Sequence, residues 1–128
     1  MIKKQFTLYL RNRPGALARV ARALARADVN IEGISVAAGV DVALVQVVVS
    51  KAAKARAALA AAGIPVTAQS VSVLTLPNVP GSLAKAAARL AKAGVNLQYI
   101  YATTRGRECS VVVSASDLRK VEELWSPE

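Results

Sequence analysis

The stretch Asn12-Arg-Pro-Gly15-Ala-Leu17 occurs twice in this chain, because it returns further along as Asn78-Val-Pro-Gly81-Ser-Leu83. A second motif keeps the same offset, with Ala27-Asp-Val-Asn30-Ile31 returning as Ala93-Gly-Val-Asn96-Leu97. No gap is needed between the two registers. A repeat of this kind indicates one structural unit that was copied and fused. We therefore expect a first repeat over residues 1–70 and a second over residues 71–128.

Hydrophobic spacing alternates along the chain between the two-residue period of strands and the 3.6-residue period of helices. The expected strands are 5–10, 30–37, 42–49, 66–76, 96–102 and 109–115, and the expected helices are 16–27, 51–62, 82–93 and 116–125. Ser50 and Ser116 are expected to cap their helices, and Leu17 and Leu83 to open inward-facing apolar stripes. The order predicts an α+β protein of two ferredoxin-like βαββαβ repeats, each with both helices on one face of an antiparallel sheet.

Two features affect how the repeats end. Residues 66–76 read as one long strand without a turn signal, so we expect this strand to close the first sheet and open the second, holding the sheets side by side. The second repeat lacks a closing strand of its own, since the sequence ends after its last helix. Its sheet is therefore expected to have an open edge, which is a common place for pairing with another chain.

The repeated Pro-Gly turn has a chemistry that suits a small zwitterion. The first amides of the following helix lack intrahelical partners and lie at the positive end of the helix dipole, where a carboxylate binds well. The side chains of Asn12 and Asn30 can both face this point, and each offers donor and acceptor atoms. An α-amino acid carries one carboxylate and one ammonium group, so it fits this set. The alternative is that Asn, Pro and Gly serve only as turn residues.

The pattern of strand, Asn-x-Pro-Gly-x-Leu, helix and Val-Asn-Ile/Leu strand closely resembles the ACT domain, a small regulatory module of amino-acid metabolism. The whole chain looks like a stand-alone tandem ACT protein. The resemblance implies amino-acid binding at ACT–ACT interfaces. It assigns the ligand contacts to two asparagines and the helix-start amides of each repeat, namely Asn12, Gly15, Ala16, Leu17 and Asn30, and Asn78, Gly81, Ser82, Leu83 and Asn96.

The chain departs from this family at Asp28, where the second repeat carries the helix-ending Gly94. Because Asp tolerates a left-handed conformation less well than Gly, the first repeat should be slightly strained there. No catalytic domain accompanies the repeats, so a bound ligand would act through assembly or on a separate enzyme of amino-acid metabolism. We expect a homodimer.

Composition argues against catalysis. The chain has no His, and its one thiol, Cys109, begins an apolar strand, where a buried structural Cys is expected. The eight carboxylates form no credible acid–base pair or metal cluster. The sequence thus predicts a non-catalytic protein without a cofactor. A lone cysteine, the absence of an apolar run long enough for a membrane helix and the absence of a signal peptide indicate a cytoplasmic protein without membrane spans.

The net charge of +9 makes nucleic acid an alternative partner. Arg19, Arg22 and Arg26 share one helical face, which we interpret as a solvated surface. The aromatic residues form no obvious stacking platform, and the nearest approach is the pair Tyr99 and Tyr101, which can equally line an interface. A purely structural oligomer without ligand is the remaining alternative. We prefer a regulatory protein that binds a small amino acid.

Overall fold

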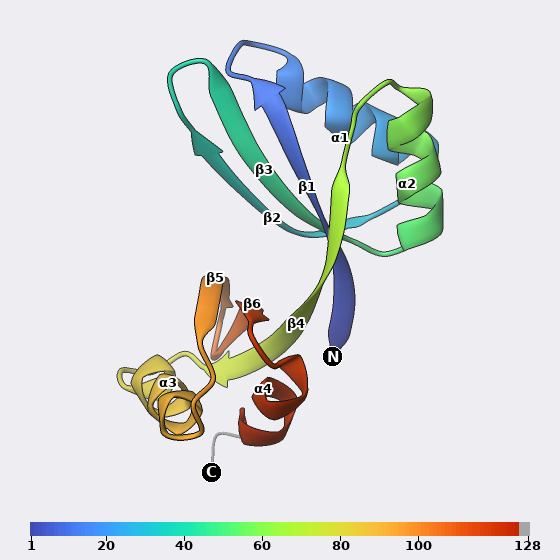
Figure 1. Cartoon of the computed structure of the whole chain (residues 1–128). Helices are drawn as coiled ribbons and strands as arrows, with labels where there is room; N and C mark the ends of the chain where they lie inside the picture. The colour runs from blue at the N-terminus through green and yellow to red at the C-terminus, as the bar shows by residue number, and fades with distance from the viewer. Residues whose placement is uncertain (126–128) are drawn as a thin grey trace. The chain divides into compact units, whose positions relative to one another are not determined.

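The structure is a computed structural model that describes residues 1–125, and residues 126–128, the end of the predicted second repeat, lie outside the described part. The elements follow the expected order (Figure 1). The strands are β1 (Ile2–Arg11), β2 (Ile31–Ala38), β3 (Val42–Val49), β4 (Thr67–Pro77), β5 (Leu97–Arg105) and β6 (Glu108–Ala115), and the helices are α1 (Ala16–Arg26), α2 (Ala52–Ala61), α3 (Ser82–Lys92) and α4 (Leu118–Leu124). The α+β prediction is confirmed.

The chain forms two compact units. The first unit comprises Lys4–Gln69, and its strands are ordered β2-β3-β1-β4. The second unit comprises Met1–Lys3 together with the chain from Ser70 onward, and its strands are ordered β1-β4-β6-β5. The single strand β4 spans the boundary, so the prediction of one uninterrupted strand is confirmed.

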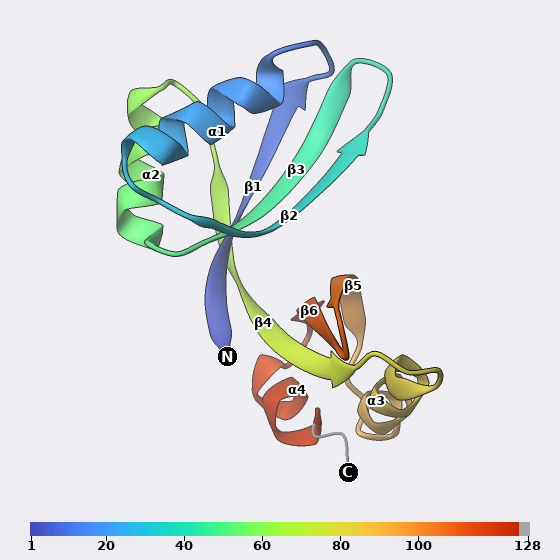
Figure 2. The ribbon, with the colours of Figure 1, turned by 180° about the vertical axis from the view of Figure 1, so that it is seen from behind.

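In the first unit, α1 and α2 lie on the same face of the sheet, as Figures 1 and 2 show. The core between them is built from alternate strand residues and one stripe of each helix, because these are the positions that a strand or helix presents to one side. Its buried side chains include Phe6, Leu8, Val20, Leu24, Val45, Val47, Leu59 and Ile64. Burying a side chain of this size contributes about 1.5–3 kcal/mol.

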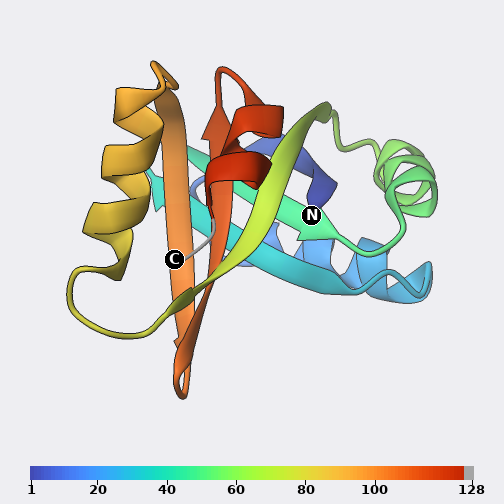
Figure 3. The same cartoon turned by 90° about the horizontal axis from the view of Figure 1, so that it is seen from below.

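In the second unit, α3 and α4 pack with the β5–β6 hairpin around a second core (Figure 3). The buried side chains of this core include Leu76, Leu90, Val111, Val113, Val121 and Trp125. Two predicted core residues are not in either core, because Leu17 is 41% exposed and Leu83 is 50% exposed. Both lie in the first turn of their helices, beyond the part of the helix that packs on the sheet.

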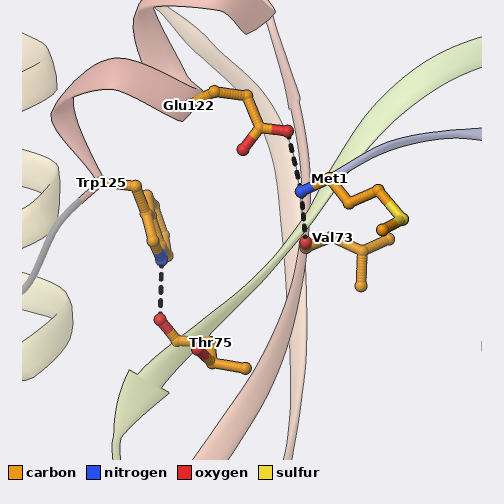
Figure 4. A network of polar contacts seen from close by, with 5 residues as sticks. All are labelled: Met1, Val73, Thr75, Glu122 and Trp125. Atoms are coloured by element: carbon orange, nitrogen blue, oxygen red, sulfur yellow. Dashed lines mark hydrogen bonds and ion pairs between the residues drawn. The ribbon is translucent and has the colours of Figure 1, made fainter.

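The predicted open edge of the second unit is paired in the structure, so that expectation was wrong. The amide of Val73 in β4 donates to the Met1 carbonyl at 2.8 Å. The Met1 amine donates to the Val73 carbonyl at 2.9 Å (Figure 4). The same amine is 2.8 Å from the Glu122 carboxylate of α4. The start of β1 thus takes the position beside β4 that a closing strand would occupy, a pairing between distant segments that local sequence patterns do not reveal.

The predicted N-caps Ser50 and Ser116 are also corrected. Helix α2 has Lys51 as its N-cap residue without a side-chain hydrogen bond, and α4 is capped by Asp117, whose side chain accepts from the Lys120 amide. The two serines directly precede these N-cap residues, and their hydroxyl groups accept hydrogen bonds from other backbone amides. The Ser50 hydroxyl accepts from the Asn30 amide at 3.0 Å, and the Ser116 hydroxyl accepts from the Asn96 amide at 3.1 Å. These hydrogen bonds link the end of β3 to the start of β2, and the end of β6 to the start of β5.

Candidate functional site

The helix tips are formed by left-handed glycines. Gly15 precedes α1 with φ 86°, and Gly81 precedes α3 with φ 90°. A Cβ added at either position would meet no atom within 4 Å, so glycine is needed for its backbone conformation rather than for space. Neither helix has a side-chain cap. The repeat therefore builds the same uncapped helix start twice.

The first amide of each helix is already used in the turn. The Ala16 amide donates to the Arg13 carbonyl and the Ser82 amide to the Val79 carbonyl, each at 3.3 Å. The next amides of the first turn have no intrahelical acceptor, because an α-helix leaves its first N–H groups unpaired. These next amides belong to Leu17 in α1 and to Leu83 in α3. They give each tip a partial positive charge.

Asn12 and Asn78 lie shortly before the starts of α1 and α3, and each forms a hydrogen bond with the turn of a β-hairpin. The Asn12 side-chain amide donates to the Gly39 carbonyl at 2.8 Å, in the turn between β2 and β3. The Asn78 side-chain amide donates to the Gly106 carbonyl at 3.0 Å, in the turn between β5 and β6. At least one donor of each carboxamide is therefore engaged by the fold, and the oxygen can still accept a hydrogen bond from a ligand.

Asn30 and Asn96 lie at the other end of the helices. Asn30 follows the C-terminal end of α1, and Asn12 precedes its N-terminal end, so one helix of 11 residues separates the two. The same holds for Asn96 and Asn78 around α3. At a rise of about 1.5 Å per residue, the helix alone places them roughly 16 Å apart. The idea that both asparagines of one repeat face the same tip was wrong.

The second unit has a pocket directly beside its helix tip. Its volume is about 250 Å³, and it is mostly apolar. The lining residues come from β4, α3, β5 and β6 and include Leu76, Asn78, Ser82, Leu83, Ile100, Tyr101, Cys109 and Val111. Three residues predicted for the site thus border one pocket. Gly81, the fourth residue predicted at this tip, directly precedes Ser82.

Cys109 and Tyr101 are polar residues of this pocket that were not predicted as site residues. Cys109 is half-buried rather than fully buried, and its Sγ lies 3.8 Å from the Asn78 side-chain oxygen, to which the thiol can donate. Tyr101 is half-buried and stacks on Tyr99, with ring centroids 6.5 Å apart. Burial raises the pKa of Tyr101, and the neighbouring phenol of Tyr99 adds to the rise. Neither residue belongs to the repeated motif, so the motif could not reveal them.

The first unit has a different cavity at its helix tip, on the side of α1 that faces the loop between α2 and β4. Its volume is about 520 Å³. Four arginines, one tyrosine and the Pro-Gly turn line it, together with Leu10, Ala16 and the residues that follow α2. The arginines are Arg11, Arg13, Arg19 and Arg22. Ala16 and Gly15 border this cavity, and Leu17 and Asn12 do not line it.

Within residues 1–125, no group of three or more metal-binding side chains comes together. No helix of that described range is long and apolar enough to cross a membrane.

Residues 1–125 match the family profile described as an ACT domain pair. The chain belongs to the ACT domain pair family. ACT domains are regulatory modules, and membership in this family supports a regulatory, ligand-binding role. No curated protein matches the chain significantly.

Several solved structures share the fold of this ACT pair. Protein BT0572 from Bacteroides thetaiotaomicron is 31% identical, with a TM-score of 0.90 over 97% of this chain and 86% of that chain. The regulatory subunit of aspartate kinase from Thermus thermophilus, in a ligand-free form, is 22% identical, with a TM-score of 0.74 over 98% and 89% of the two chains. The corresponding subunit from Thermus flavus is 20% identical, with a TM-score of 0.63 over 98% and 93%.

Proposed function

We propose that this ACT pair is a regulatory protein that binds a small amino acid with an apolar side chain. One observation carries the proposal: in the second unit, an uncapped helix start, the oxygen of Asn78 and an apolar pocket of about 250 Å³ lie together. These three elements match the three parts of an amino acid. The carboxylate would bind at the helix tip, the ammonium at the asparagine, and the side chain in the pocket.

The polar contacts have free capacity for such a ligand. The carboxylate would accept from the first-turn amide of Leu83, at the positive end of α3. Among residues 1–125, the donor that reaches the Asn78 oxygen is a weak thiol at 3.8 Å. A carbonyl oxygen can accept two hydrogen bonds, so it can also receive an ammonium proton. Leu76, Ile100 and Val111 would contact the ligand side chain, which favours an apolar amino acid over a charged one.

The first unit offers the corresponding polar groups in Asn12 and in the segment Gly15, Ala16 and Leu17. Asn30 and Asn96 keep exposed side chains at the far helix ends, where they could reach only a ligand held by another ACT module. We propose that a second copy of the chain supplies such a module, so that the ligand is enclosed in a homodimer. Val79 and Leu83 beside the pocket are 60% and 50% exposed, which suits burial against a partner.

The role we propose is regulatory rather than catalytic. Ligand binding would change the assembly of the chain or its contact with a separate enzyme of amino-acid metabolism, in the cytoplasm. Dissociation constants between about 1 mM and 1 μM, typical of metabolite sensing, correspond to roughly −4 to −8 kcal/mol.

A thermal-shift screen against the common amino acids tests the proposal. A ligand present at 100 times its dissociation constant should stabilise the folded state by about 2.7 kcal/mol, which raises the melting temperature by several degrees in a protein of this size. We expect apolar amino acids to give the largest shift. A screen in which no amino acid shifts the melting temperature would contradict the proposal.

The substitution Leu83→Glu tests the site. It puts a negative charge into the lining of the apolar pocket, close to the helix start where the ligand carboxylate would bind, and an acidic residue in the first turn of a helix is favourable to folding. Val40→Glu is the matched control, because Val40 is 92% exposed in the turn after β2. We expect the Leu83 variant to lose at least about tenfold in affinity and the Val40 variant to bind normally. Equal binding by both variants would show that the ligand binds elsewhere.

The homodimer is tested by sedimentation equilibrium with and without the amino acid that gives the largest shift. We expect the dimer to tighten when the ligand is present, because the partner copy would complete the site. If the protein stays monomeric and binds the ligand with the same affinity at all protein concentrations, the proposal that a second copy completes the site is wrong.

A further inference from the structure

The arginine cavity of the first unit is distinct from the pocket proposed above. We define it by Arg11, Arg13, Arg19 and Arg22 together with the Pro14–Gly15 turn and the segment Gly63–Pro65. All of these residues belong to the first unit. None of the lining residues is acidic, so the cavity concentrates positive charge without an internal counter-charge. The start of α1 adds the positive end of a helix dipole to the same wall.

One of the four arginines has a clear structural role. The guanidinium of Arg19 donates to the carbonyl of Ala62, the C-cap residue that follows α2, and a cation at the C-terminal end of a helix is favourable. Two of the ion pairs among residues 1–125 join Met1 with Glu122 and Lys51 with Asp28. Arg11, Arg13 and Arg22 are exposed and take part in neither. Folding therefore explains Arg19 but not the other three.

The second repeat can be compared with the first to ask whether the fold requires the three exposed arginines. In the register of the repeat, Arg11, Arg13 and Arg22 correspond to Pro77, Val79 and Ala88. The equivalent cavity of the second unit, lined by Pro77, Val79 and Lys85 among others, has a volume of only about 110 Å³. The same fold thus forms without the three arginines and with a much smaller cavity. Their presence in the first repeat calls for a reason other than the fold.

We propose that the arginine cavity binds a phosphate-bearing small molecule. Guanidinium groups present planar pairs of donors that match phosphate oxygens, which is why arginine is common at phosphate sites. A volume of about 520 Å³ lies within the usual range of small-molecule pockets. Tyr9, which also lines the cavity and is 70% exposed, can provide an aromatic surface for a base or another ring. This proposal does not depend on the amino-acid pocket of the second unit.

The cavity favours a small ligand over a nucleic-acid strand. A strand needs a groove that tracks its backbone and aromatic side chains on which successive bases stack. Here the arginines converge on one cavity, with Tyr9 as the aromatic residue in its lining. The two phosphates of a nucleoside diphosphate would engage the arginines and the helix tip, and the base would lie towards the tyrosine.

The test is calorimetric titration of the full chain with inorganic phosphate, pyrophosphate and ADP. The variant Arg13→Val/Arg22→Ala replaces these two arginines by the residues at the equivalent positions of the second repeat, Val79 and Ala88. It keeps Arg19, which has a structural role. Its matched control, Arg105→Val/Arg119→Ala, makes the same changes at exposed positions outside the cavity. Both variants lower the net charge by two, so they separate a local site from a general charge effect.

We expect pyrophosphate or ADP to bind with one site per chain. The Arg13/Arg22 variant should lose about tenfold or more in affinity, because hydrogen bonds to charged groups are among the strongest in proteins, and the control should stay within about twofold. Tighter binding of ADP than of pyrophosphate would assign a role to the base, and equal binding would limit recognition to the phosphates. Both results support the site.

Three results would overturn the proposal. The first is that no phosphate compound binds at concentrations up to about 10 mM, which is weaker than typical metabolite affinities. The second is an equal loss of affinity in both variants. The third is a single-stranded oligonucleotide that binds more tightly than ADP and depends on Arg13 and Arg22, which would make the cavity part of a nucleic-acid surface.

Discussion

Replacing Gly81 by Ala should destabilise the protein through the backbone alone. Gly81 has φ 90° and ψ −11°, a left-handed conformation that costs an L-residue about 1–2 kcal/mol. The added Cβ would meet no atom within 4 Å, so no steric clash contributes. The expected loss of stability is therefore close to the conformational cost itself. Gly15, with φ 86° and equally open surroundings, should behave in the same way.

The measurement is urea denaturation followed by far-UV circular dichroism. The midpoint should fall while the slope of the free energy against denaturant stays constant, because the surface exposed on unfolding does not change. For a unit of this size, each kcal/mol corresponds to a decrease in melting temperature of about 4–8 °C. Gly81→Asn should lose less than Gly81→Ala, since Asn is the non-glycine residue that best tolerates this region.

D-alanine at position 81, introduced by chemical ligation, provides the matched control. Its mirror-image backbone preference favours positive φ, so the D-residue should keep or raise the stability that the L-residue lowers. Equal losses for L- and D-alanine would refute the backbone argument, because they would point to missing space instead. Unchanged stability with L-alanine would refute it as well.

Further predictions concern single contacts. Trp125→Phe should lose about 0.5–1.5 kcal/mol, measured by urea denaturation, because the indole N–H donates to the β4 backbone at 3.0 Å. Ser116→Ala should lose a similar amount by the same assay, since it leaves the Asn96 amide without its acceptor. The hydrogen bond and charge of Lys51 hold the pKa of Asp28 below its ordinary 3.8, so this pair stabilises the fold above that pH and loses its effect as pH falls through the lowered pKa. The variant Lys51→Gln should therefore flatten the acid side of the stability profile, and an unchanged profile would refute the coupling.

The strain expected at Asp28 illustrates what a repeat can reveal. The sequence predicted a left-handed residue there because Gly94 occupies the same place in the second repeat, and Asp28 has φ 58°. The ion pair with Lys51, at 3.0 Å, joins residues 23 positions apart and was not expected. Local conformation could be predicted from the residue and its duplicate, whereas its partner depended on how the strands brought distant segments together.

The candidate site also contains residues that the sequence could predict and residues that it could not. The Pro-Gly turns, the helix starts and the flanking asparagines follow from the repeated motif, because they are set by neighbours within a few residues. Tyr101 and Cys109 border the pocket only because β5 and β6 pair beside the start of α3. The separation of Asn12 from Asn30 likewise depends on the length of α1. Site residues that converge through strand pairing have no common signal along the chain.

The amino-acid sequence by itself determined the order of elements, the two repeats and the α+β class, because hydrophobic period and turn chemistry act over short distances. Only the tertiary structure decided that the start of β1 pairs with β4 in the second unit, that the donors of Asn12 and Asn78 fasten hairpins, and that four arginines line one cavity. The strand pairing and the asparagine contacts join residues that are far apart in the chain, and the arginines face a cavity because the distant segment Gly63–Pro65 lies opposite them. Their energies depend on the folded arrangement as a whole, so no local pattern records them.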